Sequence, residues 1–133
     1  MINQWEEFKA GPTQPLDQRM HVTLNSRSVI LLSGNVHERM GKPDAVIMYF
    51  DKVNSIIGMR PDTTGQDNAF PVREKGIGRQ RVVRVAPFCH NHNIRVERTT
   101  TFIDPQIDET GFLSLDLRNT TQALWRRRRN PLP

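Results

Sequence analysis

The sequence lacks several features that define large classes of proteins. It holds a single cysteine, Cys89, which excludes an internal disulfide. No run of about 18 apolar residues is present, so we expect no membrane-spanning helix and no membrane partner. The first residues are acidic and polar, unlike a signal peptide. Together with the unpaired thiol and five methionines, these absences predict a cytoplasmic location.

Patterns that carry catalysis are also missing. The stretch 76–78 (Gly-Ile-Gly) has no strand before it and no helix after it, as a phosphate-binding loop requires. On a helix, Cys89, His90 and His92 would point in divergent directions, which disfavours both a zinc site and an activated thiol. We therefore expect no enzyme, no catalytic residue, no cofactor and no metal. An enzyme that uses Cys89 or a metal is the least favoured alternative.

Positive charge, by contrast, is abundant and concentrated. The chain has a net charge of +5, and residues 73–98 alone hold seven basic and two acidic side chains. Four more charges follow at Arg126–Arg129. Fifteen of the 19 basic residues are arginine, whose planar guanidinium binds two phosphate oxygens at once. This distribution favours nucleic acid as the partner; an acidic protein partner and plain surface solvation are the alternatives.

The apolar pattern predicts a mainly β protein with short helices, made of two pseudo-repeated strand–helix–hairpin units. We divide the chain into an N-terminal arm (1–19, with Trp5 and Phe8), a first unit (20–60), a linker (61–77), a second unit (78–117) and a basic C-terminal tail (118–133). In the first unit, strands 21–24 and 29–32 precede a helix over 33–41, with a capping box from Asn35 and Glu38, and a hairpin of strands 45–50 and 56–59.

The second unit repeats this order. Strand 81–85 leads into a helix at 86–92, where Asn93 takes the place of Gly41, and strands 99–103 and 112–117 are expected to form a second hairpin. A spacing of 53 residues relates Val29 to Val82 and Asp51 to Asp104. Repeated short units are typical of such spacing.

This order resembles the AbrB/MraZ swapped-hairpin family. The likeness is carried by Thr23 to Leu31 and Arg39-Met40-Gly41 in the first unit, and by Gly78-Arg79-Gln80-Arg81-Val82-Val83, Ala86-Pro87 and Asp108 to Leu113 in the second. Two units in one chain resemble MraZ more than single-unit AbrB. Ser28 and Gly34 depart from the family's glycine and helical proline. The resemblance implies an AbrB-like swapped-hairpin barrel that forms a homo-oligomer, with Arg27, Arg39, Arg79 and Arg81 facing DNA.

Strand parity separates the basic residues of this stretch. Arg79 and Arg81 share the parity of the core residue Val83, whereas Arg84 faces the other way. The candidate nucleic-acid-binding residues are Arg27, Arg39, Arg73, Lys75, Arg79, Arg81, Arg84, Arg126, Arg127, Arg128 and Arg129. The sequence thus predicts a regulator of transcription or an architectural protein that binds double-stranded DNA as a homo-oligomer. The main alternative is a self-assembling structural protein (a ring, tube or filament) whose arginines bridge subunits.

Overall fold

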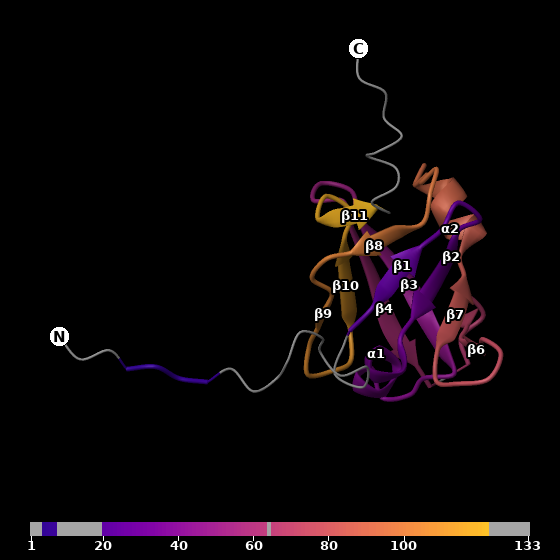
Figure 1. The fold of residues 1–133 in the computed structure, drawn as a ribbon. Helices are drawn as coiled ribbons and strands as arrows, with labels where there is room; N and C mark the ends of the chain where they lie inside the picture. Colours follow the sequence, from indigo (N-terminus) through magenta and orange to yellow (C-terminus); the bar gives the residue numbers. More distant parts are fainter. Residues whose placement is uncertain (1–3, 8–19, 64, 123–133) are drawn as a thin grey trace, which may run out of the picture.

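The computed structural model describes residues 4–7, 20–63 and 65–122. Within them the chain forms two antiparallel sheets and only two short helices, which confirms the mainly β fold class. The two sheets lie one over the other, with the helices at opposite ends of the molecule (Figure 1). Neither sheet closes on itself among these residues, so the described body is a pair of open layers.

The six-stranded layer, sheet A, has the strand order β11-β8-β1-β2-β7-β6. Its strands are Thr120–Gln122 (β11), Thr100–Phe102 (β8), Val22–Leu24 (β1), Val29–Leu32 (β2), Arg81–Arg84 (β7) and Arg73–Glu74 (β6). The five-stranded layer, sheet B, has the order β5-β3-β4-β10-β9. Its strands are Phe70–Pro71 (β5), Ala45–Asp51 (β3), Ile56–Asp62 (β4), Leu113–Asp116 (β10) and Gln106–Ile107 (β9).

The hydrophobic core lies between the two sheets. Leu24 pairs with Ile30, and Ile30 with Val83, so these three side chains share the inner face of sheet A. In sheet B, Met59 pairs with Leu113, and both side chains lie on the inner face of that sheet. All five side chains are buried and belong to one continuous cluster. Burial of each such side chain contributes about 1.5–3 kcal/mol, so this layer is the main source of stability.

The two helices are repeats of one local structure. α1 spans Gly34–Arg39 after β2, and α2 spans Ala86–Asn91 after β7. Backbone hydrogen bonds of α1 recur in α2 at positions 52 residues later in the chain. The matching donor and acceptor pairs are His37–Ser33 and Cys89–Val85, Met40–Val36 and His92–Phe88, Gly41–Glu38 and Asn93–His90, and Lys42–His37 and Ile94–Cys89. The repeat is therefore real over the strand and the helix, at a spacing one residue shorter than predicted.

Both helices end on a left-handed residue, as the sequence predicts. Gly41 has φ +93° and Asn93 has φ +55°. These two residue types adopt that conformation at the least cost, and it ends a helix. The capping box between Asn35 and Glu38 is wrong, because α1 begins at Gly34 with Ser33 as its N-cap. Glu38 instead forms an ion pair with Arg79.

Beyond the helices the two halves diverge. The first hairpin is confirmed, since β3 pairs with β4 along its whole length. The second predicted hairpin is wrong: β8 pairs with β1 and β11 in sheet A, whereas β10 pairs with β4 and β9 in sheet B. The turn at Asp108–Gly111 explains this, because the Asp108 carboxylate accepts hydrogen bonds from the backbone N–H groups of Thr110 and Phe112. That turn closes β10 onto β9 and leaves β8 to the other sheet.

The predicted linker, 61–77, is also partly ordered into strands. It contains the end of β4 and the short strands β5 and β6, which pair with β3 and β7 respectively. Strands of two residues are too short to show an alternating pattern, so no sequence periodicity reveals them.

Candidate nucleic-acid interface

The pairing of β6 with β7 determines which face of sheet A each basic residue of segment 73–84 occupies. Val83 is buried in the core, so Arg84 beside it points to the outer face of sheet A, where it is exposed. Arg73 lies opposite Val82 and therefore shares this outer face. The backbone N–H of Lys75 donates to the carbonyl of Gln80, which continues the ladder and keeps Lys75 on the same side. Arg73, Lys75 and Arg84 form no ion pair with any described residue.

Arg27 lies at the Arg84 end of this group. It sits in the turn between β1 and β2, where the Asn25 side-chain oxygen accepts hydrogen bonds from the backbone N–H groups of Arg27 (2.9 Å) and Val29 (3.0 Å). Val29 in turn lies opposite Arg84. The Asn25 turn thus fixes the backbone of Arg27, an exposed residue, at the end of the sheet where Arg84 emerges.

A row of aligned residues crosses the outer face of sheet A. From β11 to β6 it consists of Thr121, Thr101, Thr23, Leu31, Val82 and Arg73. The strands of this sheet contain one carboxylate, Glu74, and it lies opposite Arg81 on the other face. The strand positions of the outer face therefore combine cations, threonines and apolar side chains with no acidic residue. No sequence pattern singles out these threonines, since their alignment depends on strands distant in the chain.

Two of the predicted DNA-facing arginines are already paired within the chain. Arg79 pairs with Glu38 of α1, and Arg81 lies 3.7 Å from the Glu74 carboxylate (Nη2 to Oε1). Gly34 makes room for the first pair, because a Cβ atom there would lie 2.6 Å from the Cβ of Arg79. Arg79 and Arg81 thus each have an acidic neighbour within the chain, and their contact with DNA stays a prediction. The partner of Arg79 is in α1, and the partner of Arg81 is in the neighbouring strand β6. Neither pairing follows directly from residues that are adjacent in the sequence.

The remaining candidates lie elsewhere. Arg39 is the last residue of α1, at the end of the two layers, and its Nη1 donates to the Met20 sulfur at 3.3 Å. Arg126, Arg127, Arg128 and Arg129 lie outside the described residues, as do Phe8 and most of the N-terminal arm; Trp5 is exposed. The described residues contain equal numbers of basic and acidic side chains, so the net positive charge of the chain belongs to the other segments.

The Cys89 region does not form a metal site in the described part of the chain. Cys89 is buried in the core, and this burial raises the pKa of its thiol. His92 contacts Phe50 and Phe88, with ring centroids 5.0 Å away in both cases. Among the described residues, no group of three or more His, Cys, Asp or Glu side chains is arranged to hold a metal ion.

Comparisons with protein-family models, curated proteins and solved structures give no match for this chain. The resemblance to the AbrB/MraZ family therefore stays a prediction. No helix within residues 4–7, 20–63 and 65–122 is long and apolar enough to span a bilayer.

Proposed function

We propose that this protein binds double-stranded DNA through the outer face of sheet A. One observation carries the proposal: the register places Arg73, Lys75 and Arg84 together on a face whose strand positions bear no carboxylate, while Glu74 is confined to the opposite side. These cations have no ion-pair partner in the part of the chain that the structure describes, so they are available to displace counterions from phosphates. Arg27 extends this set at the β1–β2 turn.

The dimensions of the face suit a duplex. Six strands about 4.8 Å apart make a surface roughly 24 Å wide, which compares with about 34 Å for one turn of DNA. Exposed Thr121 and half-buried Thr101 add hydroxyl groups on the same face. Hydroxyls and arginines of this kind contact phosphates and position a protein without selecting a base sequence. We therefore expect binding that depends strongly on salt and weakly on sequence.

The finer part of the proposal is that the chain acts as an AbrB/MraZ-like regulator or architectural protein, assembled as a homo-oligomer. The repeated strand–helix structure supports it, since recurring hydrogen bonds relate α1 to α2 as in a chain built from two equivalent units. A homo-oligomer would repeat the outer face of sheet A and so multiply its phosphate contacts.

Neutralisation of the face tests the proposal. A triple variant with Arg73→Gln, Lys75→Gln and Arg84→Gln removes three charges from the face. The matched control, with Lys42→Gln, Arg60→Gln and Arg118→Gln, removes three charges away from it. Fluorescence anisotropy with a labelled duplex should show that the face variant binds at least about tenfold more weakly at moderate salt, with a salt slope smaller by about 2.7 log units per decade. Equal losses of DNA affinity in the two variants would show that this face is not the DNA-binding surface.

Self-assembly is the second candidate, and one feature of the fold favours it. β6 is the last strand of sheet A in the described part of the chain, and Ile77 in the adjoining loop is fully exposed. An accessible edge beside an apolar side chain is a template for strand pairing between subunits. Light scattering before and after nuclease treatment distinguishes the two functions. Large particles that keep their mass, and that disappear with Ile77→Lys, favour assembly.

A further inference from the structure

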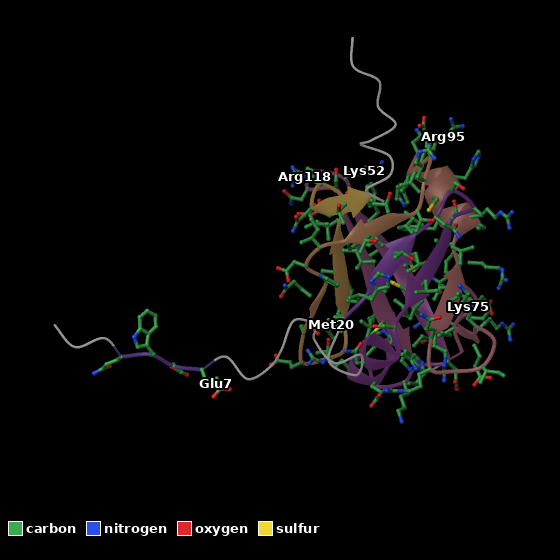
Figure 2. All side chains as sticks on the ribbon, viewed as in Figure 1. Glu7, Met20, Lys52, Lys75, Arg95 and Arg118 are labelled. Atoms are coloured by element: carbon green, nitrogen blue, oxygen red, sulfur yellow. The ribbon has the colours of Figure 1, made fainter. Side chains whose placement is uncertain are left out.

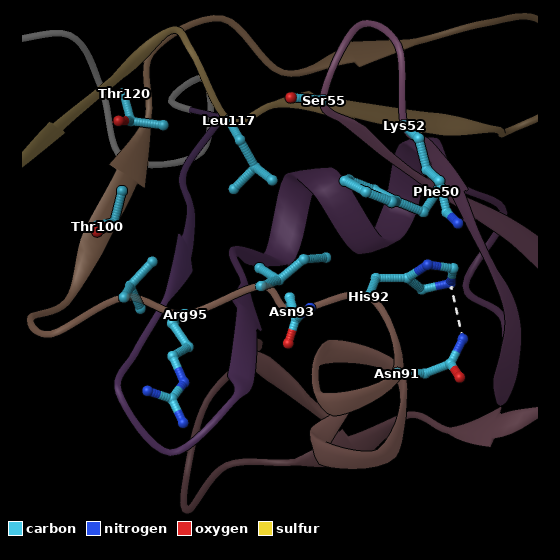
Figure 3. Close-up of a pocket in the computed structure, with 12 residues that line it drawn as sticks. Phe50, Lys52, Ser55, Asn91, His92, Asn93, Arg95, Thr100, Leu117 and Thr120 are labelled. Carbon is cyan, nitrogen blue, oxygen red and sulfur yellow. Dashed lines mark hydrogen bonds between the residues drawn. The ribbon is translucent and has the colours of Figure 1, made fainter.

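A polar pocket of about 690 Å³ lies at the α2 end of the molecule. Its walls come from three places: the end of β3 with the β3–β4 turn, the segment that leads from α2 to β8, and the end of β10 with β11 (Figure 3). The lining residues that could contact a ligand include Phe50, Lys52, Ser55, His92, Arg95 and Thr120. This volume is within the range of small-molecule sites, about 300–1,000 Å³.

The lining is basic and has no acidic member among the described residues. Lys52 and Arg95 are both exposed, and neither forms an ion pair with a described residue. Figure 3 shows them on opposite sides of the pocket, with Asn93 between them, and Figure 2 shows both at the α2 end of the molecule. Hydroxyl groups from Ser55 and Thr120 complete a lining that offers donors to an anion.

His92 supplies a second, independent observation. Its ring lies beside Phe50, on the same side of the pocket as Lys52 (Figure 3). The amide nitrogen of Asn91 lies 3.4 Å from Nε2 of His92. An amide N–H can only donate, so Nε2 accepts and the ring proton is on Nδ1. Nδ1 is buried and has no hydrogen-bond partner among the described residues. A buried donor without an acceptor is costly, and an oxygen atom of a ligand would remove that cost.

We propose that this pocket binds a phosphomonoester of mononucleotide size. Rotation of the His92 ring out of this buried position would bring Nδ1–H to a phosphate oxygen, with Lys52 neutralising the charge. The flat part of the ligand would lie along Phe50 and Leu117, and Arg95 would contact its far end. The apolar and aromatic side chains on one part of the lining and the donors on the other match such a two-part ligand.

The pocket is separate from the outer face of sheet A, because Thr100 and Thr120 reach it from the inner side of β8 and β11. The proposal goes beyond DNA binding, and it stands or falls independently of it. The phosphate could belong to a free nucleotide or to the 5′ end of a nucleic acid, and both carry the same phosphomonoester group.

Isothermal titration calorimetry of the full chain tests the site with four probes: adenosine 5′-monophosphate, adenosine, inorganic phosphate and a 5′-phosphorylated oligonucleotide. We expect the monophosphate to bind at least tenfold more tightly than adenosine or phosphate. Tight binding of the oligonucleotide alone would keep the phosphomonoester chemistry and assign the ligand to a nucleic-acid end. Equal affinity for phosphate and nucleotide, or no binding of any probe, would overturn the proposal.

Variants confirm the location. Lys52→Gln and Arg95→Gln should each weaken binding about tenfold, since each removes a charge-assisted contact. His92→Phe keeps the aromatic contact and removes the N–H donor, so it should weaken binding about fivefold. Lys42→Gln neutralises an exposed cation after α1 and should leave affinity unchanged. If Lys52→Gln and Arg95→Gln behave like this control, the ligand binds elsewhere and the proposal is wrong. Lys52 and Arg95 are surface positions, so we expect both variants to fold and the change in affinity to report on binding.

Discussion

The ring of Phe112 lies directly over Gly58 in sheet B. A Cβ atom at Gly58 would overlap this ring, whose Cε1 atom lies 2.8 Å from the Cβ position, and would also approach Tyr49. The Phe112 and Tyr49 rings are 5.7 Å apart, and the Tyr49 hydroxyl accepts a hydrogen bond from Arg60 Nε at 2.9 Å. The missing side chain at position 58 is therefore what lets the two rings pack on the outside of this sheet.

Gly58→Ala should reduce the free energy of unfolding by about 1–3 kcal/mol, because the added methyl group overpacks the ring. The melting temperature should fall by about 4 °C for each kcal/mol. Thermal and urea unfolding measure the loss. The same substitution in a Phe112→Leu background should cost less, because the smaller side chain leaves room. Identical losses in the two backgrounds would show that the ring is not the cause.

The helix ends allow a second prediction. Gly41→Ala meets no atom within 4 Å, so its whole effect is conformational at φ +93°. It should cost about 1–2 kcal/mol. At the equivalent position, Asn93→Ala should cost a similar amount and Asn93→Gly should not destabilise, since glycine tolerates φ +55°. Urea unfolding compares the three variants. A destabilising Asn93→Gly would mean that the Asn93 side chain, not its backbone conformation, is what matters.

The third prediction concerns acid stability. Hydrogen bonds from the side chain and the backbone N–H of Asn54 lower the pKa of Asp51. Hydrogen bonds from the Thr110 hydroxyl and the Phe112 backbone N–H lower the pKa of Asp108. A folded-state pKa below the unfolded value adds stability above about pH 4, which is lost as the pH falls through the folded pKa. Asp51→Asn and Asp108→Asn should thus be less stable than the parent at pH 7.

The difference between each Asp→Asn variant and the parent should shrink as the pH falls through the folded-state pKa of that carboxyl group, because the parent is then protonated there as well. Urea unfolding over a pH series measures it. If the difference in free energy of unfolding stays constant across the pH series, the charge of these carboxylates does not contribute to stability. Their effect would then come from the size and dipole of the side chain alone.

The basic tail supplies the fourth prediction. Replacement of Arg126, Arg127, Arg128 and Arg129 by glutamine keeps the chain length and removes four charges. If all four release counterions on binding, the salt slope for duplex DNA should fall by about 3 to 4 log units per decade. Anisotropy titrations over a range of salt concentrations give the slope. An unchanged slope would confine phosphate contacts to the body of the protein.

Local structure was predictable from the sequence, and long-range pairing was not. The apolar run at Val29–Leu32, the left-handed Asn93 and the first hairpin follow from patterns within a few residues, and all are present. The sequence does not predict that β8 and β10 belong to different sheets. Alternation of apolar and polar residues shows that a strand has one buried face, but it does not show which sheet the strand joins.

The same distinction holds for the candidate site. The opposite orientation of Arg84 and Val83 is a property of one strand, and it was predictable. The ion pair of Arg79 with Glu38 joins two segments distant in the chain, and the pocket has walls from three segments. Interactions of this kind depend on the packed structure, and no local pattern encodes them.

The antiparallel pairing of β2 with β7 has a consequence for how the molecule can vary. Because each of these strands leads into an equivalent helix, the same strand–helix design occurs at both ends of the molecule. In a symmetric dimer of half-length chains, every substitution would alter both ends together. Here the two ends differ in sequence: Gly34 and the Arg79–Glu38 ion pair lie at the α1 end, and the basic pocket lies at the α2 end. A covalently joined pair can thus specialise one half without altering the other.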